Sequence, residues 1–167
     1  MSEIRDYNGQ GRWSSESIQR RFASYAKSFG TAVVTLEPRA YEKGAVIWIY
    51  PLLESVIDGI IQADRACIEL GVELIEDSSS MPFGMILKSN TAKALRRSSE
   101  FLSEDQRTRI RRRVADMLIG QYMPREFIQY VKLAHSIGFN HEVARVEAEA
   151  DLTHYWVSHY LVKLRAA

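Results

Sequence analysis

The chain has one cysteine, Cys67, and four prolines in 167 residues. A single cysteine cannot form an internal disulfide, so the fold must depend on a buried apolar core, and a reducing cytoplasmic location is expected. Long apolar runs are also missing. The longest, residues 45–53, is far shorter than the roughly 20 residues that a membrane-spanning helix needs. We therefore predict a cytoplasmic protein without a membrane span.

The sequence also lacks the common catalytic and cofactor-binding motifs. His141 and Glu142 begin like the helix motif of zinc proteases, but Arg145 occupies the position of the second histidine. Lys88 and Ser89 resemble the end of a phosphate-binding loop, but no glycine precedes the lysine. We therefore predict no catalytic residue, no metal and no cofactor.

Neither sign of charge is in excess, with 22 lysines and arginines against 21 acids, but the charges are segregated. Residues 51–79 hold seven acids and one arginine, whereas residues 86–115 hold nine cations and three acids. Two interpretations follow. The two segments face each other as ion-paired helices, or the second one provides a basic surface for a partner.

Apolar residues recur at helical spacing through most of the chain. The predicted helices are residues 14–29, 51–77, 80–98, 104–121, 123–138 and 140–164. Residues 51–77 are predicted as one amphipathic helix of about seven turns. Residues 140–164 are predicted as one helix with a coiled-coil-like apolar seam. Residues 31–50 fit either a helix, which we favour, or a small β-hairpin.

This pattern predicts an all-α fold. It is either a helical bundle or a short array of helix pairs that resembles HEAT and armadillo proteins in period. The array is suggested by Met81-Pro82 and Met123-Pro124, which each open a shorter helix after a longer one, at an offset of 42 residues. Residues 1–13 are expected to be a flexible N-terminal arm. Residues 14–167 are expected to be a single helical domain.

Asp64 is out of place in this pattern, because it lies on the apolar face of predicted helix 51–77. An unpaired carboxylate would be costly there. An ion pair with Arg96 or with an arginine of residues 107–113 would make it a buried polar residue. The alternatives are a carboxylate that opens into a small-molecule or catalytic pocket, and a helix face that is not buried within the monomer.

The last predicted helix carries aromatic side chains beside its apolar seam. The candidate partner-binding residues are Tyr155, Trp156, His159 and Tyr160. Exposed tryptophan and tyrosine side chains commonly anchor protein interfaces, so this helix is predicted to bind a protein partner or a second copy. The alternative is that Trp156 belongs to the core. On this basis we predict a non-catalytic protein-interaction or regulatory module.

A nucleic-acid-binding helical protein is the alternative function, and it would use the basic segment 88–113. Arginine is well suited to bidentate phosphate contacts. The candidate polyanion-binding residues are Lys93, Arg96, Arg97, Arg109, Arg112 and Arg113. Against this alternative, the arginines of residues 107–113 fan around their helix, and the chain lacks the basic excess of nucleic-acid-binding modules.

Overall fold

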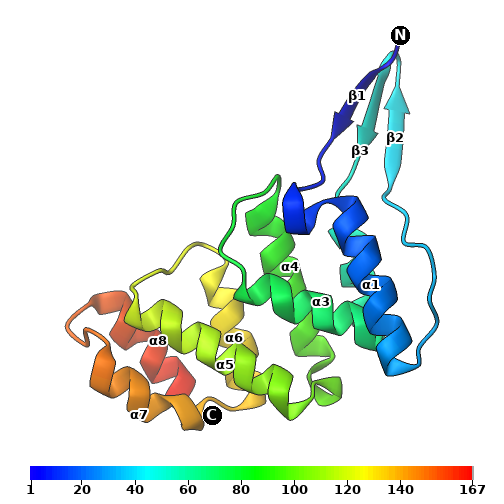
Figure 1. The fold of residues 1–167 in the computed structure, drawn as a ribbon. Helices are drawn as coiled ribbons and strands as arrows, with labels where there is room; N and C mark the ends of the chain where they lie inside the picture. The colour runs from blue at the N-terminus through cyan, green and yellow to red at the C-terminus, as the bar shows by residue number, and fades with distance from the viewer. Residues whose placement is uncertain (167) are drawn as a thin grey trace.

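The computed structural model describes residues 1–166, which form eight α-helices and one three-stranded sheet (Figure 1). The helices are α1 (Ser15–Phe29), α2 (Leu53–Ile61), α3 (Arg65–Glu76), α4 (Gly84–Arg97), α5 (Glu104–Ile119), α6 (Phe127–Ile137), α7 (Asn140–Glu149) and α8 (Tyr155–Arg165). The other elements are the strands β1 (Glu3–Asp6), β2 (Ala40–Lys43) and β3 (Val46–Ile49) and the 3-10 turns η1 (Gly11–Trp13) and η2 (Ser99–Phe101). The mostly helical class is confirmed. No helix within residues 1–166 combines the length and apolarity needed to span a bilayer.

Residues 31–50 contain a β-hairpin, so the helix that we favoured for them is wrong. Strand β2 pairs antiparallel with β3 around a turn at Gly44, whose φ is +61°. A positive φ is easy for glycine, and the β-branched residues of β3 favour an extended chain. The sheet projects away from the helices (Figure 1), and all of its residues are exposed or half-buried.

Residues 1–13, for which we predict a flexible arm, contain strand β1 and the turn η1. Strand β1 pairs in parallel with β3, with Glu3 opposite Val46. Trp13 is buried, and its indole Nε1 donates a hydrogen bond to Asp77 at 2.9 Å. The N-terminal segment is therefore tied both to the sheet and to the helical core.

The prediction of one continuous helix over residues 51–77 is wrong, because the helix is interrupted between the end of α2 and the start of α3. Ala63 adopts a left-handed φ of +59°, and Asp64 becomes the N-cap of α3. The two helices fold back so closely that a Cβ on Gly59 would lie 2.3 Å from Cys67 Sγ. An aspartate competes with helical hydrogen bonding and favours such a cap, which explains the break.

The predicted helix over residues 140–164 is wrong in the same way, since it divides into α7 and α8. Asp151 Oδ1 accepts hydrogen bonds from the backbone N–H of Thr153 at 3.0 Å and from its hydroxyl at 2.5 Å. This local turn replaces the middle of the apolar seam, where Ala150 and Thr153 offer little apolar surface. A coiled-coil seam is therefore absent from this part of the described chain.

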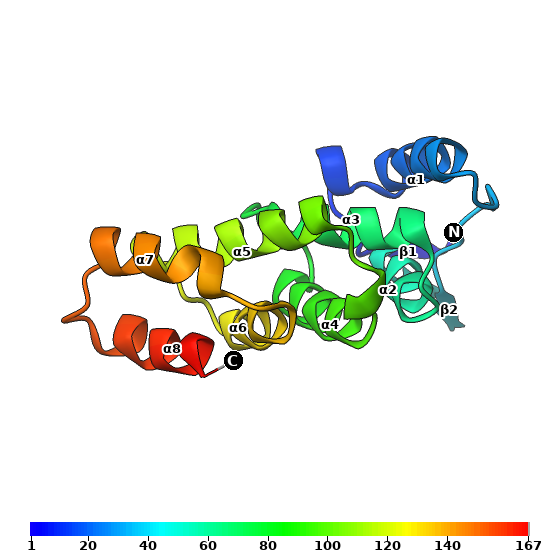
Figure 2. The same ribbon diagram turned by 90° about the horizontal axis from the view of Figure 1, so that it is seen from below.

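The helices lie in two layers (Figure 2). The first layer contains α1, α3, α5 and α7, and the second layer contains α2, α4, α6 and α8. Within each layer a helix packs against the helix two places further along the chain, and pairs such as α3 and α4 pack across the layers. Fully buried side chains such as Leu74, Leu95, Val114 and Leu133 fill the space between the layers. Each layer thus presents an outer surface.

Candidate binding surfaces

Acidic residues are absent from three successive helices of the second layer. Helices α4, α6 and α8 contain no aspartate or glutamate but carry four, one and two lysines and arginines. The helices of the first layer all contain acids. The second layer is therefore positively charged from α4 to α8, although the whole chain is almost neutral.

An open hollow of about 480 Å³ lies between α4, α6 and α8, and we call it the basic hollow. Its cationic side chains are Arg96 from α4, Lys132 from α6 and Lys163 from α8, with the exposed His135 beside them. Val131 and other small or apolar residues complete the lining, which includes no acid. An anionic group with an apolar portion would complement both parts of this lining.

Most cations of the three acid-free helices have no acidic partner. Arg165 pairs with Glu147, and the buried Lys88 donates to the carbonyl of Ser79 at 3.1 Å. The remaining five form no ion pair within residues 1–166 and are Lys93, Arg96, Arg97, Lys132 and Lys163. Their charge is therefore available to a ligand.

Arginines of α5 make internal contacts instead. Arg109 donates to Glu69 at 2.6 Å and to Glu76 at 2.9 Å, which joins α5 to α3. Burial lowers the pKa of Arg109, but the hydrogen bonds to Glu76 and Glu69 outweigh it and raise this pKa above the ordinary arginine value. Arg113 donates to the backbone carbonyl of Ile75 at 3.2 Å. These contacts support the interpretation that the acidic and basic segments face each other.

The six predicted polyanion-binding residues are thus divided between the layers. Lys93, Arg96 and Arg97 belong to α4 in the second layer, and α5 carries the other three in the first layer. Arg112 is exposed there. Arg109 and Arg113 are half-buried and donate hydrogen bonds to α3. The structure does not bring the six together, and it places Arg96 beside Lys132 and Lys163 in the basic hollow.

A buried ionic cluster joins α1 to α3, and the sequence did not reveal it. Glu73 is only 5% exposed, and it accepts hydrogen bonds from Arg21 and from the hydroxyl of Tyr25. Arg12 lies 3.0 Å from the same carboxylate. Burial, followed by the hydrogen bond to Glu73, raises the pKa of Tyr25 to about 12. Because the Glu73 carboxylate is occupied by Arg21, Tyr25 and Arg12, we assign this cluster to packing rather than to ligand binding.

The four predicted partner-binding residues of α8 form one aromatic cluster. Tyr155 is 68% exposed and Trp156 is 49% exposed, so Trp156 is not a core residue. Their ring centroids are 5.0 Å apart, and His159 stacks on Tyr155 at 5.8 Å. Tyr160 packs edge-on against Phe127 at 5.1 Å and connects the cluster to the core. The aromatic surface is therefore anchored at one end and open to a partner at the other.

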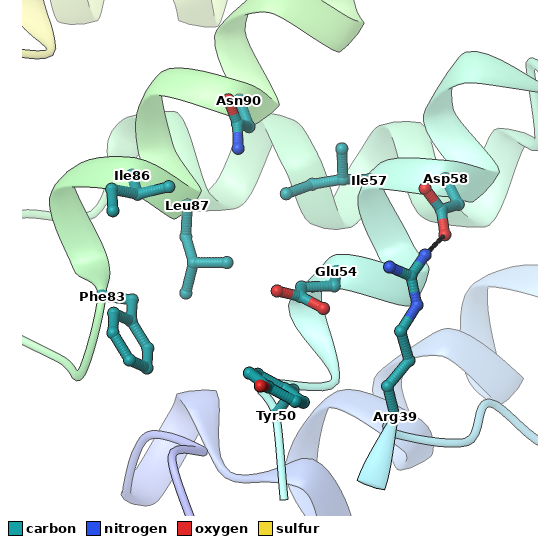
Figure 3. A pocket seen from close by; sticks show the side chains of 9 residues that line it. All are labelled: Arg39, Tyr50, Glu54, Ile57, Asp58, Phe83, Ile86, Leu87 and Asn90. Atoms are coloured by element: carbon teal, nitrogen blue, oxygen red, sulfur yellow. Dashed lines mark hydrogen bonds and ion pairs between the residues drawn. The ribbon is translucent and has the colours of Figure 1, made fainter. Parts of the chain in front are cut away.

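A pocket of about 300 Å³ lies between α2, α4 and the base of the hairpin, and we call it the α2–α4 pocket (Figure 3). Its lining residues are Arg39, Tyr50, Glu54, Ile57, Asp58, Phe83, Ile86, Leu87 and Asn90. Arg39 Nη2 lies 2.8 Å from Asp58 Oδ2 at one side. Figure 3 shows the carboxylate of Glu54 pointing into the space between Tyr50 and Leu87.

Asp64 has a local structural role at the start of α3. Its Oδ1 accepts the backbone N–H of Cys67 at 2.9 Å, and the residue is half-buried. No ion pair to Asp64 occurs among the described residues, so the predicted arginine pair is absent there. None of the five pockets described for residues 1–166 is lined by Asp64. Burial raises the pKa of the Cys67 thiol, which makes it a poor nucleophile.

Residues 1–166 contain no group of three or more histidine, cysteine, aspartate and glutamate side chains that could hold a metal ion. Comparisons with protein-family models, with curated proteins and with solved structures gave no match to this chain. A function can be argued from three surfaces. These are the basic hollow with its two lysines and one arginine, the aromatic cluster of α8, and the α2–α4 pocket.

Proposed function

We propose that the protein is a non-catalytic interaction module, and that its second layer binds an acidic segment of a protein partner. The observation that carries this proposal is the absence of acids from α4, α6 and α8, three helices that also border the basic hollow. Electrostatic complementarity of this kind favours an anionic partner and disfavours a cationic one.

The packing of the helices supports a scaffold of repeat type. In the proposed array, resembling HEAT and armadillo proteins in layout, α3–α4, α5–α6 and α7–α8 are successive helix pairs. Each pair packs across the layers, and like helices of neighbouring pairs pack within a layer. Arrays of this type use the extended surface of one layer to bind partners, which matches the position of the basic hollow.

The chemistry of the hollow favours a protein segment over a bare polyanion. Val131 and Ile128 provide apolar surface beside Lys132, so a ligand gains from apolar as well as from acidic side chains. Tyr155 and Trp156 on the same helix as Lys163 extend this surface with exposed aromatic rings. A peptide in which acidic and large apolar residues are interspersed would use all three features.

Nucleic-acid binding is the second candidate function, and the five unpaired cations of α4, α6 and α8 favour it. Single-stranded nucleic acid could place phosphates on these cations and stack bases on Trp156. The two candidates differ in one respect that can be measured. Nucleic-acid binding would weaken steeply with salt, whereas apolar anchoring of a peptide is less sensitive to salt.

Fluorescence anisotropy with two labelled probes tests the proposal. One probe is a peptide of interspersed glutamate, leucine and phenylalanine, and the other is a single-stranded oligonucleotide of equal charge. The test variant is Lys132→Gln/Lys163→Gln. The matched control, Arg20→Gln/Lys27→Gln, removes the same charge from exposed positions of α1 in the first layer.

We expect the wild-type protein to bind the peptide, the test variant to bind it about tenfold more weakly, and the control to match the wild type. Equal losses in the two variants would mean that only net charge matters, which contradicts a site in the hollow. Tight binding of the oligonucleotide alone, lost in the test variant, would replace the proposal by the second candidate.

A further inference from the structure

The α2–α4 pocket has a chemistry opposite to that of the basic hollow. Its charged lining residues are Glu54, Asp58 and Arg39. The ion pair between Arg39 and Asp58 compensates those two charges, and Glu54 keeps an excess negative charge. Its side chain forms no hydrogen bond or ion pair with any other residue of the described chain, although it is half-buried. The pocket therefore has an unused carboxylate.

Aromatic rings stand at the same opening. Phe83 lines the pocket on the side away from Arg39, and Tyr50 lies between them, as Figure 3 shows. Phe83 has a left-handed φ of +55°, which is uncommon for a bulky residue, and its ring packs against Tyr7 at 5.0 Å. Although the ring of Phe83 is held by this contact, the residue remains 47% exposed. The ring is thus fixed at the pocket and open to a ligand.

We propose that this pocket binds the guanidinium group of an arginine side chain that a partner protein supplies. A guanidinium can donate two parallel hydrogen bonds to the Glu54 carboxylate and stack its flat face on Phe83 or Tyr50. The aliphatic stem of the arginine would pass along Ile57 and Leu87, which give the pocket an apolar wall. Asn90 of α4 lines the far side of the pocket.

The commitment to arginine rests on three properties found together. A carboxylate alone would suit any cation, and rings alone would suit any apolar group. A free carboxylate, exposed rings and a volume of about 300 Å³ together match a planar group that carries five donors. This site is separate from the basic hollow, so it does not depend on the function proposed above.

Methyl NMR of the whole protein, labelled at isoleucine and leucine, provides a direct test. The methyl signals of Ile57, Ile86 and Leu87 report on the pocket. The probes are N-acetyl-arginine amide, N-acetyl-lysine amide and N-acetyl-citrulline amide, the last of which is a neutral mimic of arginine. We expect the arginine probe to shift these signals at the lowest concentration, and citrulline to bind at least about tenfold more weakly.

Two substitutions sharpen the test because they act in opposite directions. Glu54→Gln keeps the shape of the side chain and should weaken binding of the arginine probe about tenfold. Arg39→Gln removes a competing cation and should strengthen binding a few-fold. Glu100→Gln, an exposed acid on η2, is the control and should change nothing.

Equal shifts with arginine and citrulline in the wild-type protein would overturn the proposal, and this comparison needs no variant to fold. Preference for the lysine probe would also overturn it, by assigning the pocket to ammonium groups. Unchanged affinity in Glu54→Gln would show that the carboxylate is not the anchor.

Discussion

The single residue that sequence patterns made most conspicuous, Asp64, has a modest local role in the structure. It caps α3 by accepting the backbone N–H of Cys67. We predict that Asp64→Ala lowers the free energy of unfolding by about 1 kcal/mol, the usual cost of losing an N-cap. Chemical denaturation measures this change.

Asp64→Asn serves as the control for this prediction, since asparagine caps helices about as well as aspartate. It should stay close to the wild type. A loss of about 3 kcal/mol or more in Asp64→Ala would contradict simple capping and would point to a buried charge pair. We expect a loss of stability of that larger size when Glu73 is replaced, because its carboxylate is buried among Arg21, Arg12 and Tyr25.

At the scale of elements, the ends of helices could be predicted where neighbouring residues form a recognisable helix cap. The capping box of Ser103 and Gln106 begins α5, and Ser14 and Gly30 cap α1, so these helices begin within one residue of the predicted helices 104–121 and 14–29. The breaks at Asp64 and Asp151 were missed because apolar residues recur at helical spacing on both sides of each break. A periodic apolar pattern shows which face of a helical segment is buried, but it does not show whether one helix continues through the whole segment.

The candidate sites also differ in how far the sequence alone identified them. Tyr155, Trp156 and His159 lie within about one turn, so sequence spacing alone identified the aromatic cluster. Arg96, Lys132 and Lys163 are brought together only by the packing of three helices that are distant in sequence. The available signal was the absence of acids from alternate helices, which acquires meaning only when those helices are known to share a layer.

Helix α8 is where an element-scale prediction is sharpest. Tyr155→Ala/Trp156→Ala should weaken binding of the acidic peptide or reduce self-association, because it removes two exposed rings from the surface. Anisotropy and sedimentation velocity measure these two effects. Helix content by circular dichroism should not change.

The control for α8 is Ile61→Ala, which shortens an exposed apolar side chain on α2 instead of α8. It should leave binding and self-association unchanged. Loss of folding in the double variant would show that the two rings support the core, and the interface hypothesis would then be abandoned.

For the whole molecule, the order of helix contacts predicts how stability is distributed. The main contacts of each helix are with helices at most two places away in the chain. Val157→Ala, which removes a fully buried side chain from α8, should therefore speed amide hydrogen exchange in α6, α7 and α8 while leaving α1 to α3 protected. Mass spectrometry of exchanged peptides measures the exchange rates of α1 to α3 and of α6 to α8 in one experiment.

The reciprocal control is Ile18→Val in α1, which should act on the opposite end of the molecule. Faster exchange throughout the chain in both variants would contradict the prediction, because it would mean that the two layers unfold as one cooperative unit.

The parallel pairing of β1 with β3 also sets an order of events during synthesis. Glu3 pairs with Val46, so the first strand leaves the ribosome 43 residues ahead of its partner. At ordinary translation rates that interval is roughly 2 to 9 seconds. For that time β1 is an unpaired strand in a crowded solution. Its charged residues Glu3, Arg5 and Asp6 are of the kind that discourages pairing with strands of other chains, so the nascent segment can wait for β3 without aggregating.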